Sequence, residues 1–123
     1  MHGFLWFLQV VLALLFAATG VLKLIRPRDH LRELMPWTAD APLPRVRLIG
    51  VLELAAAVGL VLPGLTGILP WLTPLAATGL AVLMALASLT HYRRGEDSMI
   101  LITVPLGVVA AVVAVFRFGP YAW

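Results

Sequence analysis

The sequence contains no cysteine, and only 12% of its 123 residues are Asp, Glu, Lys or Arg. The absence of cysteine excludes disulfides, thiol redox relays and thiolate metal sites. Ordinary soluble domains carry about 25% charged residues, and disordered chains need low hydrophobicity as well as high charge. Here 62% of the residues are hydrophobic and the mean hydropathy is +1.00. A small soluble fold cannot bury that much apolar surface, so the composition predicts a protein that lives in a lipid bilayer.

Four long apolar runs stand out, at residues 3–25, 46–62, 72–92 and 98–116. Each is close to the roughly 20 residues that a helix needs to cross the hydrocarbon core. Open strands cannot span a bilayer, because their backbone groups would lack hydrogen bonds there. The predicted fold class is therefore all-α, an integral membrane four-helix transmembrane bundle. It forms a single transmembrane domain over residues 1–123.

Prolines and the long polar connector add local expectations. We expect Pro63 to end the second helix and Pro105 to kink the fourth, since proline lacks the backbone N–H of a helix interior. Residues 29–35 of the first connector predict a short interfacial helix, with Asp29 as its N-cap and Pro36 as its stop. Trp37 is expected at the level of the lipid head groups.

The distribution of Lys and Arg predicts the orientation. The connectors after the first and third helices lie on one side of the membrane, and eight basic residues lie in or beside them: Lys23, Arg26, Arg28, Arg32, Arg45, Arg47, Arg93 and Arg94. The other side has only Arg117. The positive-inside rule places the basic connectors in the cytoplasm and both termini outside. With this distribution, the pI near 10.2 indicates contact with anionic lipid head groups and no nucleic-acid partner.

Small residues are spaced for close helix packing. They recur along the second, third and fourth runs, and in the fourth they are Gly107, Ala110, Ala111 and Ala114. Small residues let helix backbones approach closely in lipid. This last stripe is a candidate homodimer seam, and a partner membrane subunit is the alternative.

Glu53 is the most informative polar residue. It follows Arg47 by six positions, which puts it about 9 Å deeper along a helix. An ionisable group at that depth is costly, and it marks a functional site by default. The alternative is that its carboxylate only ties two helices together.

Two other ionisable residues approach the membrane from the same side. Lys23 closes the first run, with Thr19 one turn deeper on the same face. The Lys23 side chain can turn inward toward Glu53 or extend outward to the surface. His91 closes the third run, and it shares a face with Met84 and Ser88. The sequence predicts that Lys23, Glu53 and His91 converge as catalytic residues, although each alone is compatible with a topology or packing role.

Such a cluster suits several chemistries. Glu53 and His91 can exchange a proton with a lipophilic substrate, because burial raises the pKa of a carboxyl group. They can instead hydrogen-bond the carbonyls of a quinone. One histidine and one glutamate are too few for a tetrahedral zinc site, so no metal is expected.

Several segments together resemble the DoxX-like family of small bacterial membrane proteins. They are Gly20-x-x-Lys23-Leu24, the segment from Arg47 to Leu54 with Gly50-x-x-Glu53, Leu60-x-Leu62-Pro63, Pro74-Leu75-Ala76-Ala77 and the segment from Met84 to His91. The resemblance extends from about residue 8 to residue 116. It implies a four-helix fold in the bacterial cytoplasmic membrane. The family pattern falls on Lys23, Gly50, Glu53, Pro63, Met84 and His91.

The resemblance also suggests what the bundle does. Some relatives are linked to quinone-dependent sulfur oxidation, such as the membrane subunits of thiosulfate:quinone oxidoreductase, and others to oxidative-stress complexes. The first hypothesis is a membrane subunit that binds a quinone or another lipophilic small molecule, with Thr19, Gly50, Met84 and Ser88 as ligand-binding residues. The second is a stand-alone enzyme that isomerises, hydrolyses or cyclises a lipophilic substrate with Glu53 and His91, while Lys23 stabilises charge. The third is a structural or assembly protein.

Overall fold

Four long helices make up the described part of the chain. The computed structural model describes residues 2–27, 29 and 42–119, and within these ranges there is no strand. Each helix is long and apolar enough to cross a membrane. The helices are α1 (His2–Ile25), α3 (Leu43–Thr66), α4 (Leu72–Arg93) and α5 (Asp97–Phe118). The fold is therefore the all-α four-helix bundle that the sequence predicts.

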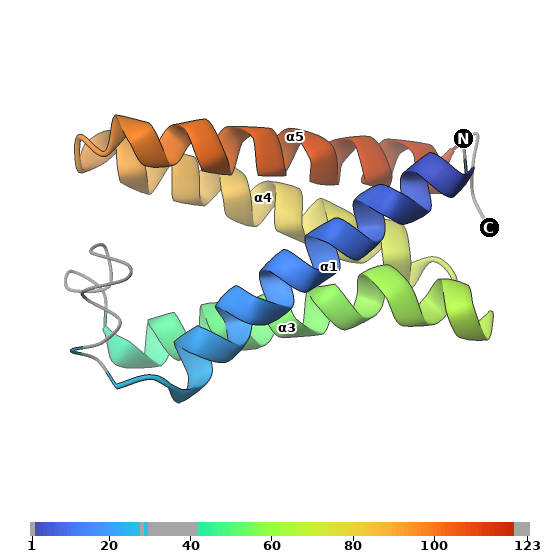
Figure 1. The fold of residues 1–123 in the computed structure, drawn as a ribbon, viewed down its shortest axis with the longest axis horizontal. Coiled ribbons are helices and arrows are strands. Elements are labelled where there is room, and N and C mark those ends of the chain that lie inside the picture. The colour runs from blue at the N-terminus through green and yellow to red at the C-terminus, as the bar shows by residue number, and fades with distance from the viewer. Residues whose placement is uncertain (1, 28, 30–41, 120–123) are drawn as a thin grey trace.

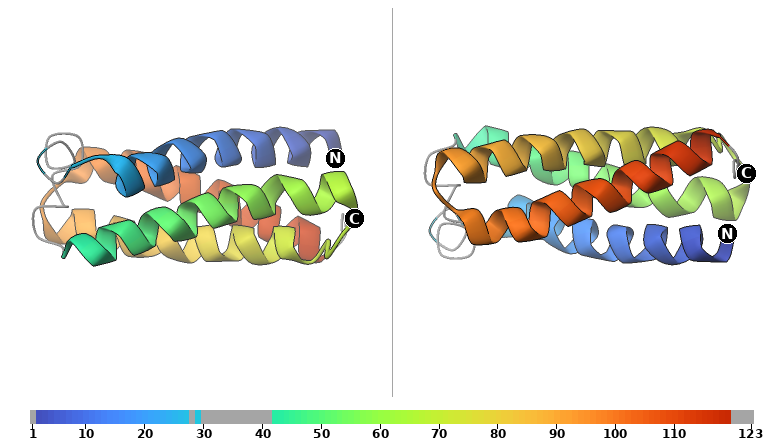
Figure 2. Two further views of the ribbon diagram at one scale, coloured as in Figure 1. Left: turned by 90° about the horizontal axis from the view of Figure 1, so that it is seen from below. Right: turned by 90° about the horizontal axis from the view of Figure 1, so that it is seen from above.

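The four helices pack as two pairs. α1 packs mainly on α3, and α4 packs mainly on α5. The two pairs meet chiefly through α3 and α4, and α1 and α5 make a smaller contact (Figure 1). Figure 2 shows that all four helices run along the long axis of an elongated bundle. The end of α1, the start of α3 and the α4–α5 turn lie at one end, and the α3–α4 connection lies at the other.

The apolar side chains point outward as well as inward. In the most apolar 18-residue stretch of each helix, only 22–28% of the residues are buried inside the chain. Large side chains such as Leu14, Leu101 and Phe7 are 68%, 77% and 63% exposed. Monomeric soluble proteins do not expose apolar surface on that scale. Because lipid tails are as apolar as these side chains, the surface identifies a multi-pass integral membrane protein.

The prediction that Pro63 ends its helix is wrong, because α3 continues to Thr66. Pro63 has no N–H to donate to the carbonyl of Gly59, four residues earlier. The hydroxyl of Thr73 on α4 donates to that carbonyl instead, at 2.9 Å. Thr73 is fully buried, so the replacement bond is shielded from solvent. The helix ends at Gly67, whose φ of 72° is left-handed and whose N–H bonds Pro63 O.

The small residues of α5 pack within the chain. A Cβ added at Gly107 would come within 3.1 Å of the Cβ of Met84 on α4. Ala110 and Ala114 are buried in the same bundle. Gly107 therefore contacts α4, and Ala110 and Ala114 lie in the core of the bundle, as expected for close helix packing. The predicted interfacial helix at 29–35 falls mostly outside the described residues, and Pro36 and Trp37 fall wholly outside them.

Candidate functional site

The closest approach between α1 and α3 is at two glycines. A Cβ added at Gly20 would lie 2.8 Å from the carbonyl oxygen of Gly50, and one added at Gly50 would lie 2.9 Å from that of Gly20. Real Cβ atoms do not tolerate such distances, so only glycine allows the backbones to come this close. Small residues at helix crossings are the usual device for close packing in lipid. Of the predicted ligand-binding residues, Gly50 is thus a helix-packing position.

An ion pair between Lys23 and Glu53 lies directly beside this crossing. The ammonium group of Lys23 bonds Oε1 of Glu53, and the hydroxyl of Thr19 bonds Oε2 at 2.5 Å. Only 1% of Glu53 and 7% of Lys23 is exposed. The structure therefore brings together Thr19, Lys23 and Glu53, and the Lys23 side chain turns inward. Each oxygen of the carboxylate has a partner, as a buried charge requires.

Arg47 supports the same region from the end of α1. The carbonyl of Lys23 would bond the N–H of residue 27 if the helix continued, but residue 27 is proline and has no N–H. Arg47 Nη1 donates to this carbonyl at 2.5 Å. Sequence reasoning counted Arg47 only as a topology charge. The sequence does contain a signal for this contact, namely the proline four residues after Lys23. It leaves the carbonyl of Lys23 without a donor from its own helix, so that another helix can supply one.

His91 belongs to a different network, at the α4–α5 turn. Its Nδ1 lies 3.0 Å from Oε1 of Glu96, and its carbonyl accepts the N–H of Glu96 at 2.8 Å. Arg94 Nε donates to the same carboxylate oxygen at 3.0 Å. The hydrogen bond from His91, helped by Arg94 and opposed by partial desolvation, lowers the pKa of Glu96 below its usual 4.5. Within the described ranges, no hydrogen bond or ion pair links His91 to Lys23 or Glu53.

Met84 and Ser88 also lie in the α4–α5 contact. Ser88 Oγ donates to the carbonyl of Met84 at 2.8 Å and shares a second bond of 2.8 Å with the hydroxyl of Thr103 on α5. The structure therefore does not bring Lys23, Glu53 and His91 together in one cluster, as the sequence predicts, but places them in two. Thr19, Lys23 and Glu53 join α1 to α3, whereas Met84, Ser88 and His91 face α5 or its turn.

A third polar cluster lies at the opposite end of the bundle, and sequence reasoning missed it. Gln9 is fully buried, and its amide nitrogen donates to Leu60 O at 2.6 Å. Arg117, 2% exposed, donates through Nε to Gln9 Oε1 at 2.9 Å, and its Nη1 lies 2.6 Å from Nδ1 of His2. These contacts connect α1, α3 and α5. Residues 108 positions apart carry no sequence signal of their contact, so only the fold reveals it.

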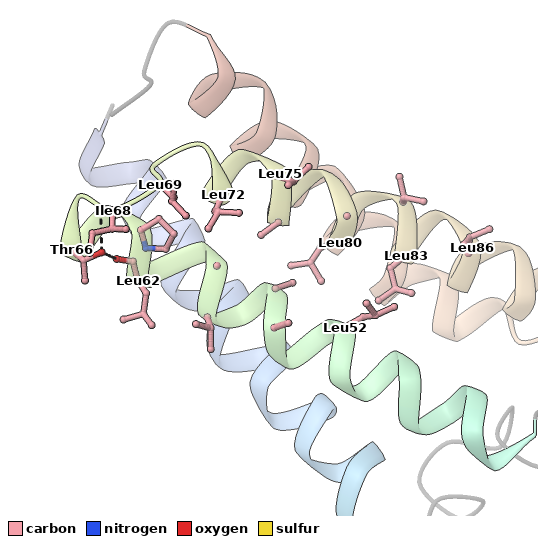
Figure 3. Close-up of a pocket in the computed structure, with 18 residues that line it drawn as sticks. Leu52, Leu62, Thr66, Ile68, Leu69, Leu72, Leu75, Leu80, Leu83 and Leu86 are labelled. Atoms are coloured by element: carbon pink, nitrogen blue, oxygen red, sulfur yellow. Dashed lines mark hydrogen bonds between the residues drawn. The ribbon is translucent and has the colours of Figure 1, made fainter.

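A groove of about 730 Å³ separates parts of α3 and α4. Figure 3 shows Leu52 of α3 and Leu80 and Leu83 of α4 on the facing sides of the two helices. Neither Lys23, Glu53 nor His91 lines the groove. The lining residues are Leu52, Ala55, Ala56, Val58, Gly59, Leu62, Pro63, Thr66, Ile68, Leu69, Leu72, Leu75, Ala76, Gly79, Leu80, Val82, Leu83 and Leu86.

The groove combines a large volume with an apolar lining. No group of three or more His, Asp or Glu side chains that could hold a metal ion lies in the described part of the chain. The groove has an apolar lining apart from the hydroxyl of Thr66. Pockets of several hundred Å³ with apolar walls and few polar groups are typical of small-molecule sites.

These features define the class as a small integral membrane protein with four spanning helices, a buried ion pair and a lateral apolar groove. A sequence model of the DoxX-like family matches residues 7–115. The chain therefore belongs to the DoxX-like family. No curated protein and no solved structure matches the chain significantly.

Proposed function

We propose that this DoxX-like protein is a membrane subunit that binds a quinone or another lipophilic small molecule in the groove between α3 and α4. It would serve a redox or stress-related membrane system together with partner proteins. The observation that carries the proposal is the groove itself, about 730 Å³ with apolar walls. Its volume is within the range of 300–1,000 Å³ that is usual for small-molecule sites.

The ion pair has a positioning role in this proposal. Leu52, Ala55 and Ala56 line the groove, whereas Glu53 between them is buried against α1. Lys23 and Thr19 therefore fix the rotation of α3, which forms one wall of the groove. Glu53 and His91 bind different partners, so the proposal does not require acid–base chemistry by these two residues together.

We place the protein in the cytoplasmic membrane of a bacterium, with its basic end in the cytoplasm. The described basic residues at that end are Lys23, Arg26, Arg45, Arg47, Arg93 and Arg94. Of the described basic residues, only Arg117 is at the other end. An asymmetry of this kind sets orientation through the positive-inside rule.

The proposal is tested with a photoreactive azidoquinone in lipid nanodiscs. After illumination, mass spectrometry should find the label on α3 and α4 groove residues, and excess decylubiquinone should remove it. Labelling spread evenly over the outward faces of all four helices, unaffected by decylubiquinone, would contradict the proposal.

The matched variants are Gly79→Leu and Gly3→Leu. A Cβ added at either glycine meets nothing within 4 Å, so both positions have open space beside the backbone. Only Gly79 lines the groove. Leucine at 79 displaces about two methylenes of ligand, and each buried methylene is worth about 0.8 kcal/mol. We therefore expect about tenfold weaker quinone binding for Gly79→Leu and unchanged binding for Gly3→Leu.

A further inference from the structure

The groove lies toward the end of the bundle that is away from the basic connectors. It begins at Thr66 and the α3–α4 connection and extends along α3 to Leu52, 14 residues away. At 1.5 Å per residue this is about 21 Å. On α4 the lining extends from Leu72 to Leu86, which is the same length. The groove therefore opens at the end away from the basic connectors and stops inside the bundle.

Beyond Glu53, whose carboxylate is turned away from the groove toward Lys23, this part of α3 and α4 carries no charged side chain. Between Glu53 and Arg93 the sequence has no Asp, Glu, Lys or Arg. Arg47 is 19 residues from Thr66 along α3, or about 28 Å. A charged head group at the Thr66 end would thus lack an opposite charge on either wall of the groove.

Hydrogen-bonding groups are nevertheless present at that end. Thr66 has the one polar side chain among the lining residues; its hydroxyl donates to Leu62 O at 2.8 Å and accepts from the N–H of Ile68 at 3.3 Å. Leu69, also in the lining, has a φ of 50°. A bulky residue in the left-handed region is strained, and such strain gathers at functional sites.

We propose that the ligand is a neutral amphiphile: an uncharged, hydrogen-bonding head at Thr66 and an apolar tail that extends toward Leu52 and Leu86. This inference rests on the proposed function, and it adds the charge and the direction of the ligand. The molecule enters sideways from the bilayer, because the lining residues Leu52 and Leu86 are themselves exposed to lipid.

The test compares farnesol with farnesoic acid, which have the same tail and differ in head-group charge at pH 8. Each competes with the azidoquinone for the groove of the wild-type protein, at equal mole fraction in the nanodisc lipid. We expect farnesol to displace the label at about tenfold lower mole fraction, which corresponds to 1.4 kcal/mol. Equal or stronger displacement by farnesoic acid would overturn the inference and leave groove binding intact. Failure of both, with no groove labelling, would instead overturn the proposed function.

The direction of the ligand is tested with Thr66→Lys and the matched control Thr90→Lys. Both threonines are exposed, and both donate to the carbonyl four residues earlier on their own helix. Only Thr66 lines the groove. A lysine at the head-group end should favour the acid, which shifts the farnesol-to-farnesoic acid preference by about tenfold. Thr90→Lys should leave the preference unchanged. An unchanged preference in Thr66→Lys would place the head group elsewhere and refute the inference.

Discussion

The Lys23–Glu53 pair shows how two charges are accommodated in a bilayer. Lys23 follows Gly20 by three residues, and Glu53 follows Gly50 by the same interval. The two glycines bring the helix backbones together, and Lys23 and Glu53 each lie less than one turn further along their own helix. Their side chains are therefore close enough to form the ion pair. Thr19 then occupies the second carboxylate oxygen. The resulting neutral cluster joins α1 to α3.

Removing one member of this pair should destabilise the protein far more than removing both. Lys23→Met leaves the Glu53 carboxylate buried without its cation, and we expect a loss of about 3–5 kcal/mol. The double variant Lys23→Met/Glu53→Leu leaves no unpaired charge and should recover most of that loss. Unfolding of the purified protein in mixed micelles, titrated with SDS, measures both. Equal loss in the single and double variants would contradict this expectation, because the lone Glu53 carboxylate would then add no cost of its own.

The sequence predicted that Glu53 lies deep within a helix of the bundle but left the direction of Lys23 open. Depth follows from spacing along a helix, so an acid six residues inside Arg47 can be recognised without a structure. The direction of a flexible Lys side chain depends on the neighbouring helix, which spacing does not specify. For the same reason the Gln9–Arg117 contact was missed: both partners are recognisable, but their distance depends on how α1 packs on α5.

At the scale of the helices, the sequence predicted the spans well and their ends less well. Hydropathy identifies about 20 apolar residues reliably because the bilayer thickness fixes the length. The end of α3 depends instead on Thr73 of α4, which satisfies the carbonyl that Pro63 leaves free. A tertiary contact thus overrode a local rule. His91 is a similar case, because a five-residue interval to Glu96 predicts their contact only when the turn geometry is known.

The α4–α5 turn should respond to acid. The folded turn lowers the pKa of Glu96, chiefly through His91. The charged carboxylate therefore stabilises the turn at pH values above the usual pKa of 4.5, and this stabilisation is lost as the pH falls through the lowered pKa. The protection factors of amides 94–97, which are the exchange rates of the unstructured chain divided by those of the protein at the same pH, should fall over that range in the wild type. Glu96→Gln should give low protection factors at every pH, and a wild-type profile without a step would contradict the assignment.

At the scale of the whole molecule, each of the two helix pairs contains its own set of polar contacts. The α1–α3 pair contains the buried ion pair, and the α4–α5 pair contains the Ser88–Thr103 bond and the His91–Glu96 turn. The groove lies where the pairs meet, between α3 and α4. Polar contacts stabilise each pair, and the bond from Thr73 to the carbonyl of Gly59 joins the pairs beside the groove. A ligand at the junction would therefore contact both pairs at once.

The orientation of the molecule can be determined with cysteine labelling, since the chain has no cysteine of its own. Ser98→Cys adds one thiol at the basic end, and Ile68→Cys adds one at the opposite end; both positions are exposed. If the basic end is cytoplasmic, a membrane-impermeant maleimide should label the Ile68 variant in intact bacterial spheroplasts. It should label the Ser98 variant only after permeabilisation, in which both variants must react. The reverse pattern would place the Thr66 end of the groove in the cytoplasm, so the neutral ligand would then enter from the inner leaflet.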